Sequence, residues 1–106
     1  MSFIIVYTTN KDEAEARKIA AHLLKKRLIA CANFFPIGSM YWWEGRIQED
    51  KEVVSILKAR EEDWEAVKEE ITSLHSYGCP CIIRLSADAN KGYEDWLEGQ
   101  ASRPGR

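Results

Sequence analysis

The sequence predicts an α+β fold in which one antiparallel β-sheet carries two α-helices on one face. Runs of β-branched and aromatic residues alternate along the chain with two segments whose apolar residues recur at helical spacing. A chain of 106 residues also has room for only one modest hydrophobic core. We therefore expect a single domain over residues 1–100 and a disordered tail over residues 101–106.

The first two predicted elements are a strand and a helix. Residues 3–8 are all β-branched or aromatic, which favours a strand. Thr9 and Asn10 can cap a helix, and Glu13 follows at the spacing of a capping box. Across residues 12–27, small and apolar side chains recur at helical spacing, with acids in the first turn and bases in the last. This pattern predicts an amphipathic helix that packs on a sheet.

A long, kinked hairpin arm is expected next. In residues 28–35 both alternating sets of side chains are apolar, which predicts a strand covered on both faces. Pro36 and Gly38 should interrupt this strand with a bulge or bend. A second extended stretch follows over residues 39–43.

The remaining elements complete the pattern after a turn at Glu44 and Gly45. Residues 47–58 favour helix in their first half and strand in their second, and pairing back across the turn favours strand. A single apolar stripe predicts a helix over residues 62–74. A short buried strand over residues 82–85 and a helical turn or edge segment over residues 93–97 follow. This order of elements is that of the ferredoxin-like split βαβ sandwich.

Self-association is expected from this fold. Both helices cover one face of the sheet, so the other face and the aromatic residues of the hairpin, Tyr41, Trp42 and Trp43, must be covered from outside the chain. A second copy of the chain is the simplest cover.

Charge and cysteine content exclude several classes of partner. With 17 acidic and 15 basic side chains the formal net charge is only -2, which is too weak a basic footprint for nucleic acid or an anionic membrane. The apolar start of the chain is far shorter than a membrane span of ~20 residues and lacks a basic leading region. Three cysteines, Cys31, Cys79 and Cys81, without an export signal predict free thiols and a cytoplasmic, reducing location.

Several short motifs occur together between Ile4 and Leu97. They are Thr8-Thr9 before Glu13-Ala14, Ala30-Cys31-Ala32-Asn33, Ser39-x-Tyr41-x-Trp43 with Gly45, Glu52, Lys58, and His75-x-Tyr77-x-x-Pro80-x-Ile82. In this order and spacing, the chain resembles the CutA divalent-cation tolerance family. The resemblance implies a ferredoxin-like subunit, a homotrimer whose long hairpin arms pair between neighbours, and an association with copper and other divalent cations.

The chain departs from the family pattern in its last motif. Where the family usually has His-Pro-Tyr-Glu-x-Pro-Glu-Ile, this chain has Ser76, Gly78 and Cys81, and Ala59 follows Lys58 where the family usually has threonine. Two carboxylates are lost, and thiols stand at positions 79 and 81 of the same loop. The change puts any inherited oxygen ligation in doubt.

The candidate metal ligands are Cys31, His75, Cys79 and Cys81. Thiolate and imidazole donors suit copper or zinc better than magnesium or calcium, and the fold can place Cys31 near the loop. The alternative is structural. Free cysteine often serves as a small buried hydrophobic residue, and His75 at a helix end can cap free carbonyl groups.

A second candidate site is a polar pocket at the subunit boundary. The family's matching residues suggest that it contains Tyr41, Trp43, Glu52, Lys58 and Tyr77, beside His75, and that it takes a small anion or ion. For the aromatic residues of the hairpin, burial in a subunit interface is the alternative.

The leading hypothesis for function is a divalent-cation tolerance protein that binds copper or a similar metal ion at or near the subunit interfaces of a homotrimer. The alternative is a PII-like trimeric regulatory module that binds a small molecule in intersubunit clefts, which fold analogy alone supports. A purely structural oligomer that tethers other proteins is a further possibility. We expect no enzymatic activity, because no nucleophile is paired with a base in a recognisable signature.

Overall fold

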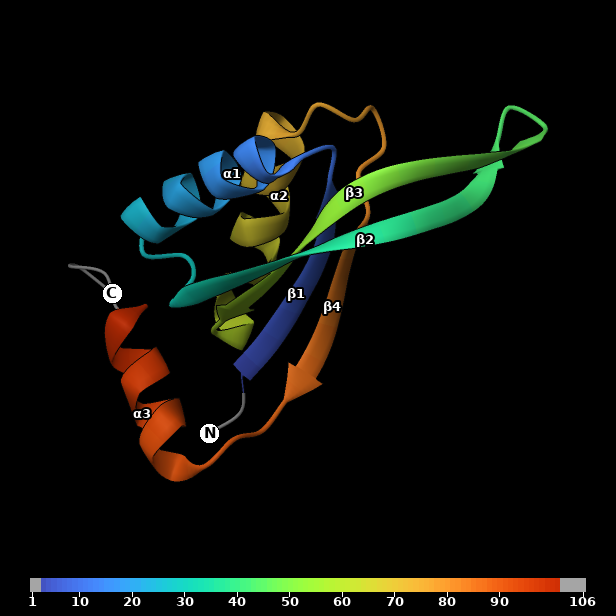
Figure 1. Ribbon diagram of the computed structural model, residues 1–106. Helices are drawn as coiled ribbons and strands as arrows, with labels where there is room; N and C mark the ends of the chain where they lie inside the picture. The colour runs from blue at the N-terminus through green and yellow to red at the C-terminus, as the bar shows by residue number, and fades with distance from the viewer. Residues whose placement is uncertain (1–2, 102–106) are drawn as a thin grey trace.

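The structure is a computed structural model that describes residues 3–101. Within these residues the elements follow in this order: β1 (Phe3–Asn10), α1 (Glu13–Lys25), β2 (Cys31–Trp43), β3 (Arg46–Ala59), the short 3-10 helix η1 (Glu61–Asp63), α2 (Trp64–Leu74), β4 (Ile82–Ala87) and α3 (Lys91–Gln100) (Figure 1). The expected tail lies outside the described residues except for Ala101, which is buried at the end of α3.

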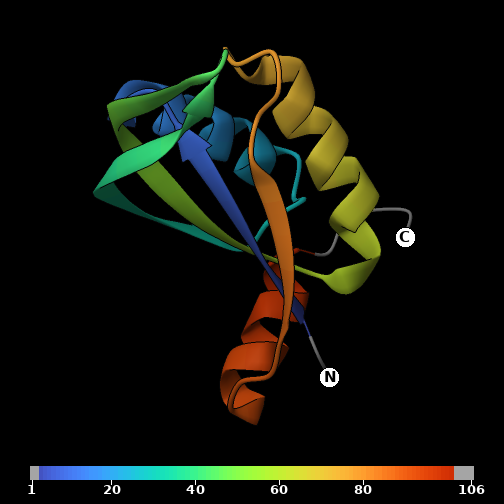
Figure 2. The ribbon, with the colours of Figure 1, turned by 90° about the vertical axis from the view of Figure 1, so that its right-hand side faces the viewer.

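The four strands form one antiparallel sheet in the order β2-β3-β1-β4. Helices α1 and α2 cover one face of it, whereas α3 lies at the end of the sheet opposite the arm (Figures 1 and 2). The order of elements and strands confirms the predicted ferredoxin-like sandwich. Residues 47–58 belong to strand β3, as pairing across the turn predicted, and residues 93–97 belong to a complete helix.

The hydrophobic core lies between α1, α2 and the covered face of the sheet. Ile4 and Val6 of β1 and Leu57 of β3 pack against apolar residues of both helices, and all three are at most 1% exposed. Ile4 and Val6 lie on the same, covered face because successive side chains of a strand point to opposite faces. Full burial of each such side chain contributes roughly 1.5–3 kcal/mol.

Helix α1 begins two residues later than the capping signal predicted. Its N-cap is Asp12, whose Oδ1 accepts a hydrogen bond from the Glu15 backbone N–H at 2.8 Å. The prediction of a cap at Thr9 and Asn10 is wrong because Asn10 belongs to β1. Its side-chain Nδ2 is buried and donates to the Val53 carbonyl and to Ser55 Oγ, each at 3.1 Å.

The hairpin arm is continuous. Strands β2 and β3 pair from Cys31 opposite Lys58 to Trp43 opposite Arg46 without a change of register, so there is no bulge at Pro36. Proline is tolerated here because β2 is an edge strand. The predicted turn is confirmed, and its two residues have positive φ, 51° and 77°, as a tight type I′ hairpin requires.

The face of the sheet opposite the helices is uncovered in the single chain, and we call it the bare face. Strand β4 was predicted to be buried, but Ile83 and Leu85 on this face are 47% and 53% exposed. The strand predicted over residues 28–35 was expected to be covered on both faces, but in the single chain it is covered on one. Phe34 packs on the core, whereas Phe35 is 43% exposed.

Candidate ligand pocket

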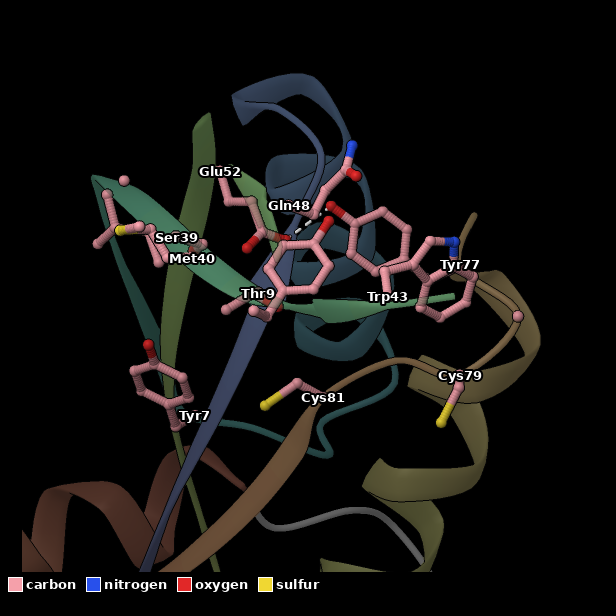
Figure 3. A pocket seen from close by; sticks show the side chains of 14 residues that line it. Tyr7, Thr9, Ser39, Met40, Trp43, Gln48, Glu52, Tyr77, Cys79 and Cys81 are labelled. Carbon is pink, nitrogen blue, oxygen red and sulfur yellow. Dashed lines mark hydrogen bonds between the residues drawn. The ribbon is translucent and has the colours of Figure 1, made fainter. Parts of the chain in front are cut away.

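A pocket of about 740 Å³ lies on the bare face where the arm leaves the sheet (Figure 3). Residues of β1, β2, β3 and the loop between α2 and β4 line it: Tyr7, Thr9, Ile37, Gly38, Ser39, Met40, Tyr41, Trp43, Gln48, Glu52, Tyr77, Gly78, Cys79 and Cys81. The volume is within the range of small-molecule sites, roughly 300–1,000 Å³.

Strand register brings the sheet residues of this pocket together. In β1 the residues that face the helices are buried, so Tyr7 and Thr9 between them point to the bare face. In the arm, Glu52 pairs with Ile37, and Gln48 pairs with Tyr41, so these side chains share that face.

His75 fixes the loop that forms the other wall of the pocket. Its imidazole Nε2 lies 2.7 Å from the Thr9 carbonyl oxygen, and its Nδ1 accepts a hydrogen bond from the Tyr77 backbone N–H at 3.1 Å. These partners require a neutral ring protonated on Nε2. The side chain is fully buried, and neither ring nitrogen has a lone pair available to a metal, so His75 is not placed to be a ligand. Its ring bonds to the carbonyl of Thr9 in β1 and not to a carbonyl of the preceding helix. His75 instead positions Tyr77.

Glu15 supports the same loop from helix α1. Its side chain is 7% exposed, and its carboxylate accepts hydrogen bonds from the backbone N–H groups of Ser76 at 2.9 Å and Lys11 at 3.0 Å. Burial by itself would raise the pKa of Glu15, but the hydrogen bonds from Ser76 and Lys11 outweigh it and lower the pKa. Glu15 is therefore ionised at neutral pH.

The carboxylate of Glu52 lines the pocket, and that of Asp50 lies next to the lining residue Tyr41. The Tyr77 hydroxyl donates to Glu52 Oε2 at 2.7 Å, and the Tyr41 hydroxyl donates to Asp50 Oδ2. Burial and the Glu52 carboxylate raise the pKa of Tyr77 and, more weakly, that of the Cys81 thiol. The hydrogen bond to Asp50 raises the pKa of Tyr41. Both tyrosines and Cys81 are therefore neutral at physiological pH.

The structure brings together four of the five residues predicted for the pocket: Tyr41, Trp43, Glu52 and Tyr77. It excludes Lys58, whose Nζ lies 5.4 Å from the centre of the Tyr93 ring at the other end of the sheet. With His75 neutral and buried, the described lining has no cationic side chain. The pocket predicted for a small anion or ion thus has no positive side chain among its lining residues in one chain.

The four predicted metal ligands do not converge. Cys79 and Cys81 are exposed and line the pocket, but the Sγ of Cys31 contacts the Tyr93 hydroxyl at 3.4 Å. Pairing places Cys31 level with Leu85, so Cys81 lies ~13 Å away along the strands and ~14 Å across them. Among residues 3–101, no group of three or more histidine, cysteine or acidic side chains is placed to hold a metal ion.

Sequence reasoning missed several residues of the pocket, including Tyr7, Thr9 and Gln48. The alternation of β1 could have placed Tyr7 and Thr9 on the uncovered face. Their proximity to the loop after α2 depends on strand order and on the bond between His75 and Thr9, which no local pattern reveals.

The family model described as CutA1 divalent ion tolerance protein matches residues 4–100 of this chain. The chain belongs to this family. The divalent-cation tolerance protein CutA of Pyrococcus horikoshii is 55% identical over 95 residues, which cover 89% of this chain and 93% of that protein. The family predicted from the sequence motifs is therefore confirmed.

Solved CutA structures share the fold throughout. The crystal structure of CutA1 from Pyrococcus horikoshii has a TM-score of 0.91 at 50% identity, covering 94% of this chain and 99% of that chain. The periplasmic divalent cation tolerance protein CutA from Archaeoglobus fulgidus has a TM-score of 0.92 at 39% identity, covering 96% and 100%.

The compartment of this CutA family member stays a prediction. The Archaeoglobus fulgidus relative is described as periplasmic, whereas the cysteine content here predicts the cytoplasm. In the part of the chain that the structure describes, no helix has the length and apolar character needed to cross a membrane.

Proposed function

We propose that this CutA family member acts in divalent-cation tolerance as a homotrimer, with its ligand pocket at the boundary between subunits. The observation that carries the proposal is the set of large apolar side chains exposed on the bare face and the arm: Phe35, Met40, Tyr41, Trp42, Trp43, Ile47, Ile83 and Leu85. So many exposed large apolar side chains on one sheet face and its arm are typical of an interaction site.

The arm supports assembly more specifically. Met40 and Trp42 project from one of its faces, and Tyr41 and Trp43 from the other, all between 39% and 72% exposed. An isolated two-stranded ribbon is marginally stable at best in water, and this one exposes large apolar side chains of β2 on both of its faces. Pairing of each arm with neighbouring subunits meets this need, and the family resemblance supports three copies.

For the metal, we propose that copper or a similar soft cation binds through Cys79 and Cys81 beside Glu52. Because the described residues of one chain provide no complete ligand set, a neighbouring subunit must supply the remaining donors. The thiols must lose their protons, and the pKa of Cys81 is raised, so the apparent affinity should increase with pH. We propose no enzymatic role for these residues.

The alternative function is that of a PII-like trimeric module that binds a small molecule in the intersubunit cleft. The observation in its favour is the volume of the pocket, about 740 Å³, which far exceeds what a single ion needs.

The test of assembly is native mass spectrometry combined with light scattering at micromolar concentration. We expect a mass of three subunits. A stable, folded monomer would overturn the trimer.

The test of metal binding is equilibrium dialysis against copper and zinc. We expect about one ion per subunit, retained in the Cys31→Ser control and lost in the Cys79→Ser, Cys81→Ser double variant. Occupancy well below one ion per subunit, or no effect of the double variant, would exclude ligation by this pair. A thermal-shift screen in which nucleotides but not metals stabilise the protein would favour the PII-like alternative.

A further inference from the structure

We infer that the pocket on the bare face binds a small organic cation, a quaternary ammonium or protonated amine, and discriminates against anions. The inference goes beyond the proposed function, on which it rests only for the place of the pocket at the subunit boundary, and it names a second ligand class. Three features carry it: aromatic lining from several elements, a fixed carboxylate, and the absence of cationic side chains from the described lining.

The aromatic lining comes from three separate parts of the chain. Tyr7 lies on β1, Tyr41 and Trp43 lie on β2, and Tyr77 lies in the loop after α2. Aromatic ring faces carry negative potential and attract quaternary ammonium groups, most strongly in tryptophan. In Figure 3, Tyr7, Tyr77 and Glu52 lie around one hollow, with the Sγ of Cys81 also directed into it.

A fixed negative charge accompanies the rings. Glu52 is held by the Tyr77 hydroxyl at 2.7 Å, and Tyr77 is itself held by His75 and indirectly by the buried Glu15. The position of the carboxylate is thus set by a chain of hydrogen bonds that reaches into the core. A preorganised site of this kind loses little entropy when it binds a ligand.

Positive side chains of the arm lie outside this lining. Arg46 pairs with Trp43 and shares its face of the arm, but Arg46 is not among the residues that line the pocket. Lys51 lines a different groove, next to the start of α1 on the other side of the arm. None of the 14 lining residues is a lysine, arginine or histidine.

The aromatic lining of the pocket favours an organic cation over a bare metal ion. A hard divalent cation such as magnesium keeps a tightly held shell of oxygen ligands, which tyrosine and tryptophan faces cannot replace. A quaternary ammonium ion is weakly hydrated, and it can contact ring faces and the carboxylate together.

The experiment compares two probes of the same shape by titration calorimetry on the intact protein. Choline carries a quaternary nitrogen, and 3,3-dimethylbutan-1-ol carries a neutral carbon in its place. We expect saturable binding of choline and at least ~10-fold weaker binding of the neutral alcohol.

Matched variants locate the site. Glu52→Gln should weaken choline binding by ~5-fold or more, since it removes a unit charge next to the ligand. Glu49→Gln changes the net charge equally on the same strand, but its side chain is on the opposite face of the arm, and it should leave binding unchanged. Trp43→Leu should weaken binding by ~3-fold or more, and it provides a second test if Glu52→Gln does not fold.

Three results would overturn the inference: equal affinity for both probes, no saturation up to ~50 mM choline, or an equal effect of Glu49→Gln and Glu52→Gln. Light scattering on the same sample shows whether the cation site or the proposed trimer is the part that fails. A trimer that does not bind choline overturns the cation site alone. A monomer that binds choline in a Glu52-dependent way overturns the trimer alone.

Discussion

The two faces of the sheet differ sharply, although the same strands form both. On the helix side, Ile4, Val6 and Leu57 are almost fully buried, whereas on the bare face Ile83 and Leu85 remain about half exposed. One face is completed by helices of the same chain. The other also carries apolar side chains but is not covered by any element of the same chain, so it is the place where partners and ligands can contact the protein.

The hydrogen bonds of the pocket connect these two sides. Glu15 belongs to α1 on the covered side, and it binds the loop from which Tyr77 reaches the bare face. Substitutions on the covered face are therefore expected to change mainly stability, and substitutions on the bare face mainly ligand binding. Substitutions in this hydrogen-bond network should change both.

The largest effect is expected on the covered face. Leu23→Ala removes a fully buried side chain of α1 and should lower the free energy of unfolding by about 3 kcal/mol, because it leaves a cavity in the core. Chemical denaturation measures the change. The control is Leu24→Ala on the same helix, where the side chain is 40% exposed and the loss should be well under half as large. Equal losses would mean that the two sides of α1 do not differ as described.

A smaller effect, of a different kind, is expected on the arm. Trp42 is 72% exposed in the single chain, so Trp42→Ala should leave the subunit folded by circular dichroism. If the arm is buried between subunits, the substitution should weaken association by about 2 kcal/mol, as for a tryptophan at the centre of an interface. Dilution followed by light scattering measures this. Glu49→Ala on the same arm is the control, and an unchanged dissociation profile for Trp42→Ala would place Trp42 outside any interface.

The smallest effect is expected at Glu15, and it depends on pH. Glu15→Gln should cost about 1 kcal/mol at neutral pH, since a charged hydrogen-bond acceptor becomes neutral. The folded-state pKa of Glu15 is lowered, so its contribution is fully present above the ordinary value of 4.5 and is lost as the pH falls through the folded-state pKa. Thermal unfolding of the two proteins should therefore differ at pH 7 and converge in acid. Glu13→Gln, at an exposed surface pair with Arg17, should show little difference at either pH.

Sequence reasoning was accurate where local patterns decide the structure. The apolar stripes of both helices, the β-branched and aromatic run of β1 and the turn at Glu44 and Gly45 depend on neighbours within a few residues. It failed at Asn10, which has a good capping side chain but bonds instead to Ser55, 45 residues away. It also failed at Pro36, because the position of β2 at the sheet edge is a property of the assembled sheet.

For the candidate site, the motifs identified several residues of the pocket, but they did not show which motif residues lie together in space. Tyr41, Trp43, Glu52 and Tyr77 converge as the family resemblance suggested, whereas Lys58 and Cys31 lie at the other end of the sheet and His75 is used internally. Residue type suggests what a side chain can bind. Its hydrogen-bond partners decide whether the lone pair is free.

The sequence by itself determined the family and the order of helices and strands, because periodicity and motif spacing are local. It also indicated an apolar surface that is too large for a single chain to cover. Only the tertiary structure decided which polar groups share a pocket and which are already satisfied. Strand register sets distances between residues far apart in the chain, and the bond between His75 and Thr9 joins positions 66 residues apart. Such contacts form only when the whole sheet has assembled, so they leave no local signal in the sequence.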